Sequence, residues 1–307
     1  MKNKLIVITG GAGFIGSNIA RSLCEKNEVT VIDNLFTGRC ENISDIADRI
    51  RFIKEDATNL DMLMREFQFA DYVLHQAALP SVLRSVEDPI TTNRNNLDST
   101  LNVLIAARDC EVKRLVFASS SAIYGDACQI PVPETASPKP LSPYAVTKLA
   151  GEHYCKVFYE VYGLETVSLR YFNVFGPGQD PRSEYAAVIP KFINAIKNDG
   201  RPVVYGDGMQ TRDFVFVEDV VRANVLACDA PKAAGRIFNI ATGEGTSLNQ
   251  FLDTLRTITG RVIEPIYTDP RRGDIRDSVA DISQANNILG YEPHVKMEKG
   301  LRVMLSC

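Results

Sequence analysis

Residues 4–16 read KLIVITGGAGFIG, and this stretch decides the fold. Leu5–Ile8 is a short apolar run with β-branched residues, which predicts a strand buried on both faces. The glycine-rich turn Thr9–Gly13 cannot continue that strand, and apolar residues recur at helical spacing from Phe14 to Leu23. Strand, glycine turn and helix form a dinucleotide site, where glycines admit a pyrophosphate and the helix N-terminus offers free N–H groups.

A second strand is predicted over Val29–Ile32, and Asp33 follows it directly. This carboxylate lies about twenty residues past the glycines, where an acid holds the ribose of an adenosine. Because an acid repels a 2′-phosphate, Asp33 and Asn34 favour NAD over NADP. The alternative interpretation is a glycine-rich turn without a ligand.

The composition limits the classes of protein to which this chain can belong. The chain has 307 residues, 45% of them hydrophobic, with a net charge of −4 and no long basic run, so we expect no nucleic-acid partner. No apolar run is long enough to span a membrane, and no cleavage site follows the N-terminal strand. The seven cysteines show no CxxC spacing, which suggests reduced thiols in the cytoplasm. The three histidines show no spacing typical of metal ligands, so we expect no metal.

The first half of the chain repeats one unit. Strands predicted over 50–54, 72–75, 115–119 and 166–170 alternate with helices, of which 91–108 and 144–161 are long. This alternation predicts an α/β fold with a doubly wound parallel sheet of the Rossmann type, which binds ligands at the carboxyl ends of its strands. The polar residues expected at those ends are Asp33, Asp56, Gln76, Ser119–Ser121 and Asn173.

After Gly176 the alternation stops. A loop is expected over 176–181, and helices are expected over 186–196, 217–228 and 248–258 with short strands between them. We therefore expect an NAD-binding domain over 1–173, to which 213–243 returns. Residues 174–212 and 244–307 are expected to form a smaller α/β domain that binds the substrate.

The segment Tyr144-Ala-Val-Thr-Lys148 is the candidate catalytic motif. Tyr144 and Lys148 occupy positions i and i+4, which share one face of a helix. An ammonium near a phenol lowers the pKa of the tyrosine, which can then act as a general base. The run Ala118–Ser121 is expected to face the same crevice. The alternatives are a chance spacing among eleven tyrosines and a hydrophilic serine turn.

Three motifs together resemble the extended short-chain dehydrogenase/reductases: TGGAGFIG at 9–16, the serine run before Tyr124-Gly125, and Tyr144-x-x-x-Lys148. Within that group the chain looks most like the UDP-hexose 4-epimerases. RYFNVFGP at 170–177, GDGMQTRDF at 206–214 and RRGDI at 271–275 carry that match. The resemblance covers essentially the whole chain, and it implies a tightly held NAD and a nucleotide-sugar substrate.

The resemblance also implies the site residues. It assigns catalysis to Ser120, Tyr144 and Lys148. The cofactor contacts that it implies are Gly10, Gly13, Phe14, Ile15, Gly16, Asp33, Asn34, Phe36, Thr37, Gly38, Asp56, Ala57, Gln76, Ala77, Ala78, Asn95, Ser119, Tyr144, Lys148, Tyr171, Asn173 and Val174. The substrate contacts that it implies are Ser81, Ser120, Ser121, Tyr144, Asn173, Val188, Tyr205, Arg212, Arg271, Asp274 and Ser278. Arginines suit a pyrophosphate, which needs cationic multidentate donors, although an arginine in a surface salt bridge is the alternative.

The serine run argues for epimerisation. Dehydratases that resemble this chain carry Thr-Asp-Glu before the Tyr-Gly pair, and sugar-acid decarboxylases keep a glutamate there. This chain reads Ser120-Ser121-Ala122, so neither reaction has its usual acid or base. UDP-glucuronate 4-epimerases usually have threonine in place of Asn173. A glucuronate epimerase, a dehydratase and a non-catalytic NAD-binding regulator remain as alternatives.

The resemblance implies a mechanism without net redox change. Tyr144 removes the proton from the sugar O4, directly or through Ser120, while the C4 hydride passes to NAD and leaves a 4-keto sugar. The sugar then turns about its pyrophosphate linkage, and the same cofactor returns the hydride to the other face. Lys148 is expected to bond the nicotinamide ribose as well.

One position suggests which sugar fits. In epimerases of this kind the residue four past the Asp of Arg-x-Gly-Asp limits the C2 substituent, and here it is Ser278. A serine leaves space for an acetamido group where a tyrosine would not, and Ser81 is expected to lie near enough to bond that group. We therefore expect UDP-GlcNAc and UDP-GalNAc to interconvert, with UDP-glucose and UDP-galactose also accepted. The alternative is that another residue fills the pocket.

A homodimer is expected from the two long helices. Val146, Leu149, Val157 and Phe158 give the second helix apolar residues on more than one face. In the resembling family the equivalent pair of helices forms a four-helix interface, which would be isologous here. The alternative is that all these residues face the sheet.

Overall fold

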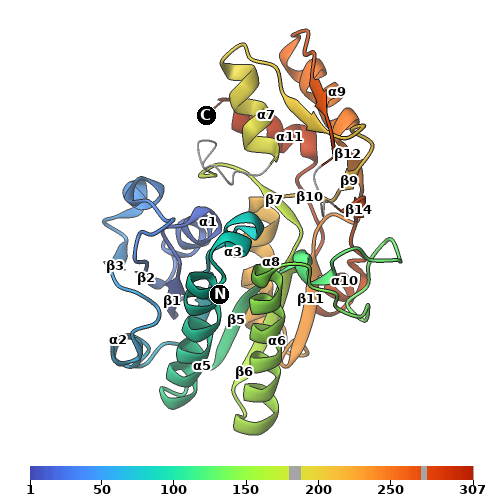
Figure 1. Cartoon of the computed structure of the whole chain (residues 1–307). Helices are drawn as coiled ribbons and strands as arrows, with labels where there is room; N and C mark the ends of the chain where they lie inside the picture. The colour runs from blue at the N-terminus through green and yellow to red at the C-terminus, as the bar shows by residue number, and fades with distance from the viewer. Residues whose placement is uncertain (180–187, 271–274, 307) are drawn as a thin grey trace.

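A computed structural model describes residues 1–179, 188–270 and 275–306. At its centre is a seven-stranded sheet in the order β11-β6-β5-β4-β1-β2-β3, in which every neighbouring pair is parallel (Figure 1). The strands are β1 (Leu5–Thr9), β2 (Glu28–Ile32), β3 (Ile50–Ile53), β4 (Tyr72–His75), β5 (Arg114–Ser120), β6 (Glu165–Tyr171) and β11 (Arg236–Ile240). The predicted doubly wound α/β fold is confirmed.

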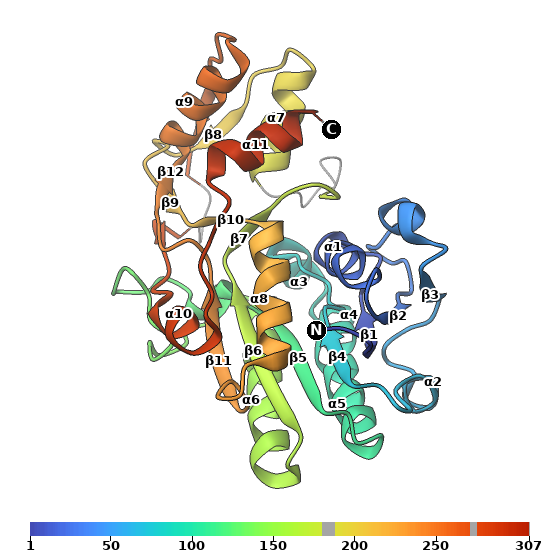
Figure 2. The same cartoon turned by 180° about the vertical axis from the view of Figure 1, so that it is seen from behind.

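Helices cover both faces of this sheet. One apolar core joins it to α1 (Phe14–Leu23), α8 (Val217–Asp229) and α10 (Ser283–Leu289). The other core joins it to α2 (Leu60–Glu66), α5 (Ser99–Asp109) and α6 (Pro143–Tyr162). Figure 1 shows α5 and α6 in front of the sheet, and Figure 2 shows α8 on the opposite face. Because both faces are covered, strands such as β4 are buried along their whole length, which explains why their sequences are mostly apolar.

The turn after β1 requires glycine. Gly10 has φ +70°, and a Cβ placed there would lie 2.6 Å from the Ala77 backbone nitrogen. A Cβ on Gly16 would collide with the Gly10 carbonyl oxygen, so the helix can approach the strand only without a side chain there. Gly13 is the N-cap of α1 and has no side chain to cap it. The first N–H groups of α1 are therefore presented at the carboxyl edge of the sheet.

The long helix predicted over 91–108 differs from the expectation. It is divided into α4 (Pro89–Asn93), a π-helical turn η2 (Arg94–Asp98) and α5. Apolar periodicity does not report one wider turn inside a helix, so the sequence did not show the division. The helix predicted over 144–161 is observed as α6, which starts at Pro143 after the N-cap Ser142 and ends at Gly163 in a left-handed conformation.

A smaller part lies above the sheet in Figure 1. Its core lies between α7 (Val188–Lys197), α9 (Leu248–Thr259) and α11 (Met297–Ser306). Short strands surround it: β7 (Asn173–Phe175), β8 (Val203–Tyr205), β9 (Thr211–Arg212), β10 (Phe214–Phe216), β12 (Thr246–Ser247), β13 (Ile266–Thr268) and β14 (Asp277–Ser278). Between β10 and β12 the chain returns to the central sheet as α8 and β11. No helix in the described ranges is both long enough and apolar enough to cross a membrane.

Candidate functional site

A cavity of about 880 Å³ opens where β1, β2, β4 and β5 end. All the residues expected to contact the cofactor line it except Asn173, and Ser81 and Ser120 line it too. The cavity runs from Asp33 on one side to Tyr144 and Lys148 on the other. Residues that the motifs place far apart in the chain therefore share one elongated space.

The end of the cavity at Asp33 has features that suit the binding of a ribose. The two Asp33 carboxylate oxygens accept backbone hydrogen bonds from Ala12, at 3.0 Å, and from Leu35, at 2.8 Å. Burial raises the pKa of Asp33, and these hydrogen bonds oppose that rise. A Cβ on Gly38 would lie 2.7 Å from the Asp33 carboxylate, so glycine there leaves the acid accessible from the cavity. With the uncapped N-terminus of α1, these features fit an NAD adenosine and its pyrophosphate.

Tyr144 and Ser120 meet at the other end of the cavity. Tyr144 is in the first turn of α6 and Ser120 is the last residue of β5. Burial raises the pKa of Tyr144, and the hydrogen bond between the Ser120 and Tyr144 side chains acts against that rise. The two hydroxyl groups are therefore placed to exchange a proton with a bound alcohol.

Lys148 is buried one helical turn further along α6. Its Nζ donates to the Ala118 carbonyl oxygen at 2.7 Å and lies 5.0 Å from the centre of the Phe117 ring. Burial lowers the pKa of Lys148 to about 8. The expected lowering of the Tyr144 pKa is wrong for the protein alone, because burial of the phenol raises this pKa and the opposing contribution comes from the hydrogen bond with Ser120.

Two of the predicted serines lie at the starts of short helices. Ser81 is the N-cap of α3 (Val82–Glu87), and its Oγ accepts from the Arg84 backbone N–H at 3.1 Å. The hydroxyl hydrogen of Ser81 therefore remains available to donate into the cavity. Ser121 starts the 3₁₀ turn η3 (Ser121–Tyr124) and does not line the cavity.

The remaining predicted substrate residues lie in or beside the smaller part. Val188 begins α7 and Tyr205 ends β8, while Ser278 of β14 is the register partner of Arg212 on β9. Asn173 begins β7, and its backbone N–H donates to the Asp213 carbonyl oxygen. None of these five lines the cavity. Arg271 and Asp274 lie outside the described residues.

Several cavity residues were not predicted. The guanidinium of Arg84 lies 4.5 Å from the centre of the Phe36 ring, and both residues line the cavity from different segments. No local spacing links α3 to the segment after β2, so the sequence carried no signal for this contact. The unpredicted lining residues are Ile32, Leu35, Arg39, Asn42, Glu55, Leu79, Pro80, Arg84, Ser99, Ala118, Phe172, Gly178 and Gln179. Within the described ranges, no group of three or more His, Cys, Asp or Glu residues could hold a metal ion.

Comparison with known proteins identifies the family. The model of the NAD dependent epimerase/dehydratase family matches residues 6–241. The UDP-glucose 4-epimerase of Mycolicibacterium smegmatis is 37% identical over 301 residues, which are 96% of this chain and 95% of that protein. The UDP-N-acetylglucosamine 4-epimerase of Methanobrevibacter ruminantium M1, solved with UDP-N-acetylmuramic acid, is 43% identical with a TM-score of 0.96, covering 100% and 98% of the two chains.

The UDP-glucuronic acid 4-epimerase of Bacillus cereus was solved with UDP-glucuronic acid and NAD. It is 34% identical, with a TM-score of 0.91 over 100% of this chain and 98% of that one. The glycine turn, the Asp33 end of the cavity and the Ser120, Tyr144 and Lys148 cluster agree with these matches. The chain belongs to the NAD dependent epimerase/dehydratase family, and NAD is its cofactor.

Proposed function

We propose that this enzyme inverts C4 of a UDP-hexose, interconverting UDP-GlcNAc with UDP-GalNAc and UDP-glucose with UDP-galactose. The observation that carries the proposal is the hydroxyl pair of Ser120 and Tyr144 beside Lys148, without a carboxylate in the segment Ser120–Ala122. Proton transfer at one oxygen needs such a pair, whereas elimination or decarboxylation needs an acid there. The similarity to UDP-sugar 4-epimerases over nearly the whole chain supports the same reaction.

In the proposed reaction, each residue of the site would have a separate role. Tyr144 takes the proton of the sugar O4, directly or through the Ser120 hydroxyl, and later returns a proton to the same oxygen. Bound NAD would supply the acceptor and donor for the C4 hydride, and its positive charge would favour the Tyr144 phenolate. Lys148 supplies a second positive charge and a donor for the ribose, and the buried walls around Tyr144 exclude water.

Ser278 is proposed to set the size limit at the sugar C2. Its register pairing with Arg212 brings it beside a cation suited to the UDP pyrophosphate. Replacing Ser278 by tyrosine should lower kcat/KM for UDP-GlcNAc and UDP-GalNAc by about 10- to 100-fold, because the added ring overlaps the acetamido group. The same change should leave UDP-glucose and UDP-galactose turnover nearly unchanged. Initial rates with all four sugars measure this, with Ser278→Ala as the control; equal slowing of both pairs would contradict the assignment.

A UDP-glucuronate 4-epimerase is the second candidate, because the Bacillus cereus enzyme of that activity has the same fold over the whole chain. Asn173, where those enzymes usually have threonine, argues for a neutral hexose. Incubating the protein with UDP-GlcNAc, UDP-glucose and UDP-glucuronate separates the candidates. A dehydratase or a non-catalytic regulator is less well supported, because no acid follows Ser120 and because Ser120, Tyr144 and Lys148 are all present.

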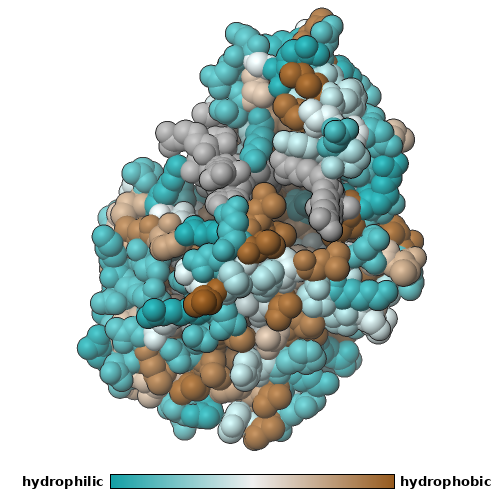
Figure 3. Space-filling model, in the orientation of Figure 1, coloured by the Kyte–Doolittle hydropathy of each residue, from teal (hydrophilic) through white to brown (hydrophobic). Residues whose placement is uncertain are grey.

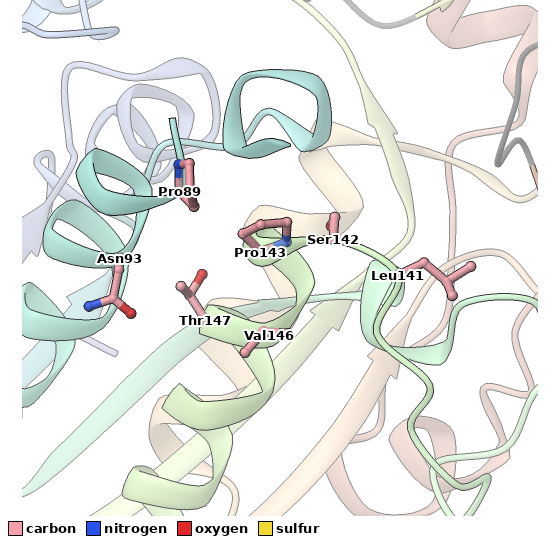
Figure 4. A pocket seen from close by; sticks show the side chains of 7 residues that line it. All are labelled: Pro89, Asn93, Leu141, Ser142, Pro143, Val146 and Thr147. Carbon is pink, nitrogen blue, oxygen red and sulfur yellow. The ribbon is translucent and has the colours of Figure 1, made fainter. Parts of the chain in front are cut away.

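We also propose a homodimer formed through α5 and α6. Val146 and Val157 on α6 are 51% and 45% exposed, whereas Phe158 is buried against the sheet. Figure 3 shows hydrophobic side chains on the face that carries α3 and α6 in Figure 1. Figure 4 shows a hollow between α4 and the first turn of α6, lined by Pro89, Asn93, Leu141, Ser142, Pro143, Val146 and Thr147. A second copy of α6 could cover this apolar surface across an isologous interface.

Charging the proposed interface should separate the dimer. The double variant Val146→Glu/Val157→Glu should sediment at half the wild-type mass at micromolar concentration, because the interface would then bury two unpaired carboxylates per subunit. Val262→Glu is the matched control, since Val262 is 91% exposed in the smaller part. A wild type that sediments as a monomer of 33.9 kDa would refute the dimer.

Two further assignments belong to the proposal. We assign residues 1–173 and 213–243 to NAD binding and residues 174–212 and 244–307 to UDP-sugar binding, in agreement with the return of α8 and β11 to the central sheet. We assign the enzyme to the cytoplasm, because the six described cysteines are free thiols, which suits a reducing compartment.

A further inference from the structure

A buried ion pair lies directly beneath the serine run. Arg170 of β6 donates from Nε and Nη2 to the two carboxylate oxygens of Glu152, at 2.8 and 2.7 Å. The side chains of Arg170 and Glu152 are 3% and 2% exposed, so the pair is nearly sealed from water. Arg170 also donates to the Tyr124 hydroxyl at 2.7 Å, and that hydroxyl donates to Asn239 Oδ1 of β11 at 2.7 Å. The network thus joins α6, β6, η3 and β11.

Stability alone does not account for this pair. Removing two ions from water costs several kcal/mol per ion, and apolar residues of similar size are often as stabilising as a buried pair. Neither Glu152 nor Arg170 lines the cavity, and the proposed chemistry uses neither. What distinguishes Glu152 is its position on the catalytic helix.

Tyr144, Lys148 and Glu152 occupy positions i, i+4 and i+8, which are successive turns on one face of α6. Each contacts a different residue at the end of β5. The Tyr144 hydroxyl bonds Ser120, and the Lys148 ammonium donates to the Ala118 carbonyl at 2.7 Å. Ser119 Oγ donates to Glu152 Oε1 at 2.5 Å. Three adjacent contacts therefore fix α6 against the strand that carries the serines, and Glu152 makes the third.

Among the described residues that interact with the Lys148 ammonium, Glu152 is the one that carries a negative charge. The titratable groups that interact with the ammonium are Glu152 and Cys155 of α6 and His75 of β4, while Tyr144 lies one turn before it on α6 and Arg170 of β6 pairs with Glu152. Burial lowers the pKa of His75 to about 3 and raises the pKa of Cys155 to about 12, so both are neutral near pH 7. Cys155 and Glu152 are the groups that oppose the lowering of the Lys148 pKa by burial, and of these two only the Glu152 carboxylate is charged near pH 7.

We propose that Glu152 is a positioning residue for the epimerase site: it fixes α6 on β5 through Ser119 and supplies the buried negative charge that keeps the Lys148 ammonium protonated. Arg170 holds this carboxylate in place from the neighbouring strand. The inference deepens the proposed function, since it assigns the electrostatic support of Lys148 to a residue outside the cavity.

The first test is the pH dependence of kcat in Glu152→Gln, which keeps the shape of the side chain and removes its charge. Lys148 supports the reaction while protonated, so wild-type kcat should fall as the pH rises through about 8. Loss of the anion disfavours the ammonium, so this fall should move about one pH unit or more toward lower pH. Glu152→Asp retains the charge and should keep the wild-type position of the fall. A wild-type pH profile in Glu152→Gln would overturn the proposal.

Two further variants test whether Glu152→Gln acts only by destabilising the fold. Glu165→Gln is the matched control, because Glu165 pairs with the buried Arg114 at the opposite ends of the same two strands. It should lower stability without moving the pH profile. The double variant Glu152→Gln/Arg170→Met leaves no unpaired buried ion, so it should fold, and its profile should move in the same direction but less than in Glu152→Gln, because the Arg170 cation is removed as well. Failure of both Glu152→Gln and the double variant to fold would also refute the proposal, because the pair would then be structural.

A second measurement needs no substrate. The pKa of Lys148, about 8 in the folded protein, lies below its ordinary value of 10.5, so the free energy of unfolding should rise with pH between these values. In Glu152→Gln this rise should begin at a lower pH, as urea unfolding against pH would show. A wild type that turns over no UDP-hexose would refute the proposed function, while this titration would still decide the role of Glu152.

Discussion

Replacing Tyr144 by phenylalanine should lower kcat by about 10²- to 10⁴-fold, the usual contribution of a positioned general base. The phenol hydroxyl is the group that meets Ser120 at the end of the cavity, and phenylalanine removes it while it keeps the buried ring. The fold and the NAD content of the purified protein should stay unchanged. Initial rates with UDP-GlcNAc and UDP-galactose, together with the absorbance of NAD released on denaturation, measure both parts of this prediction.

Tyr154→Phe is the matched control for Tyr144→Phe. Tyr154 is on the same helix and packs against the apolar core on that face of the sheet, outside the cavity. Removing its hydroxyl should leave kcat within about twofold of the wild type, since it takes no part in the proposed proton transfer. Full activity in the Tyr144 variant would disprove the assignment of the base.

Replacing Lys148 by alanine is the second change with a large expected effect. It removes a buried cation and the proposed donor to the nicotinamide ribose, so kcat should fall by about 10²-fold or more and NAD should be lost during gel filtration. Lys156→Ala is the control, because Lys156 lies on α6 with its side chain 60% exposed and pairs only with Glu160 among the described residues. An alanine variant that retained both NAD and wild-type kcat would contradict the role given to Lys148.

The nucleotide-binding half follows from local sequence. A buried β-branched run, glycines at Gly10 and Gly16 that no other residue can replace, and an acid at Asp33 each depend on neighbours within about thirty residues, the length of one βαβ unit. These signals located the sheet edge at which the cavity opens, and the family resemblance supplied most, though not all, of its lining residues. Local pattern was sufficient there because the fold repeats one short unit.

Other features depend on contacts between distant segments. Ser278 and Arg212 are register partners although 66 positions separate them in the sequence. The periodicity of apolar residues does not predict such a pairing. The network of Glu152, Arg170 and Ser119 likewise joins residues of three elements. The expected lowering of the Tyr144 pKa failed for a related reason, because spacing places a charge but does not report how completely the phenol is removed from water.

The central claim is that one cofactor takes a hydride from C4 and returns it to the same carbon. The most direct measurement incubates the purified protein with UDP-GlcNAc carrying deuterium at C4, without added NAD, and follows the products by mass spectrometry and NMR. The account predicts UDP-GalNAc that retains the deuterium at C4. Absence of the C4 epimer, or an epimer whose C4 hydrogen has exchanged with solvent, would contradict it.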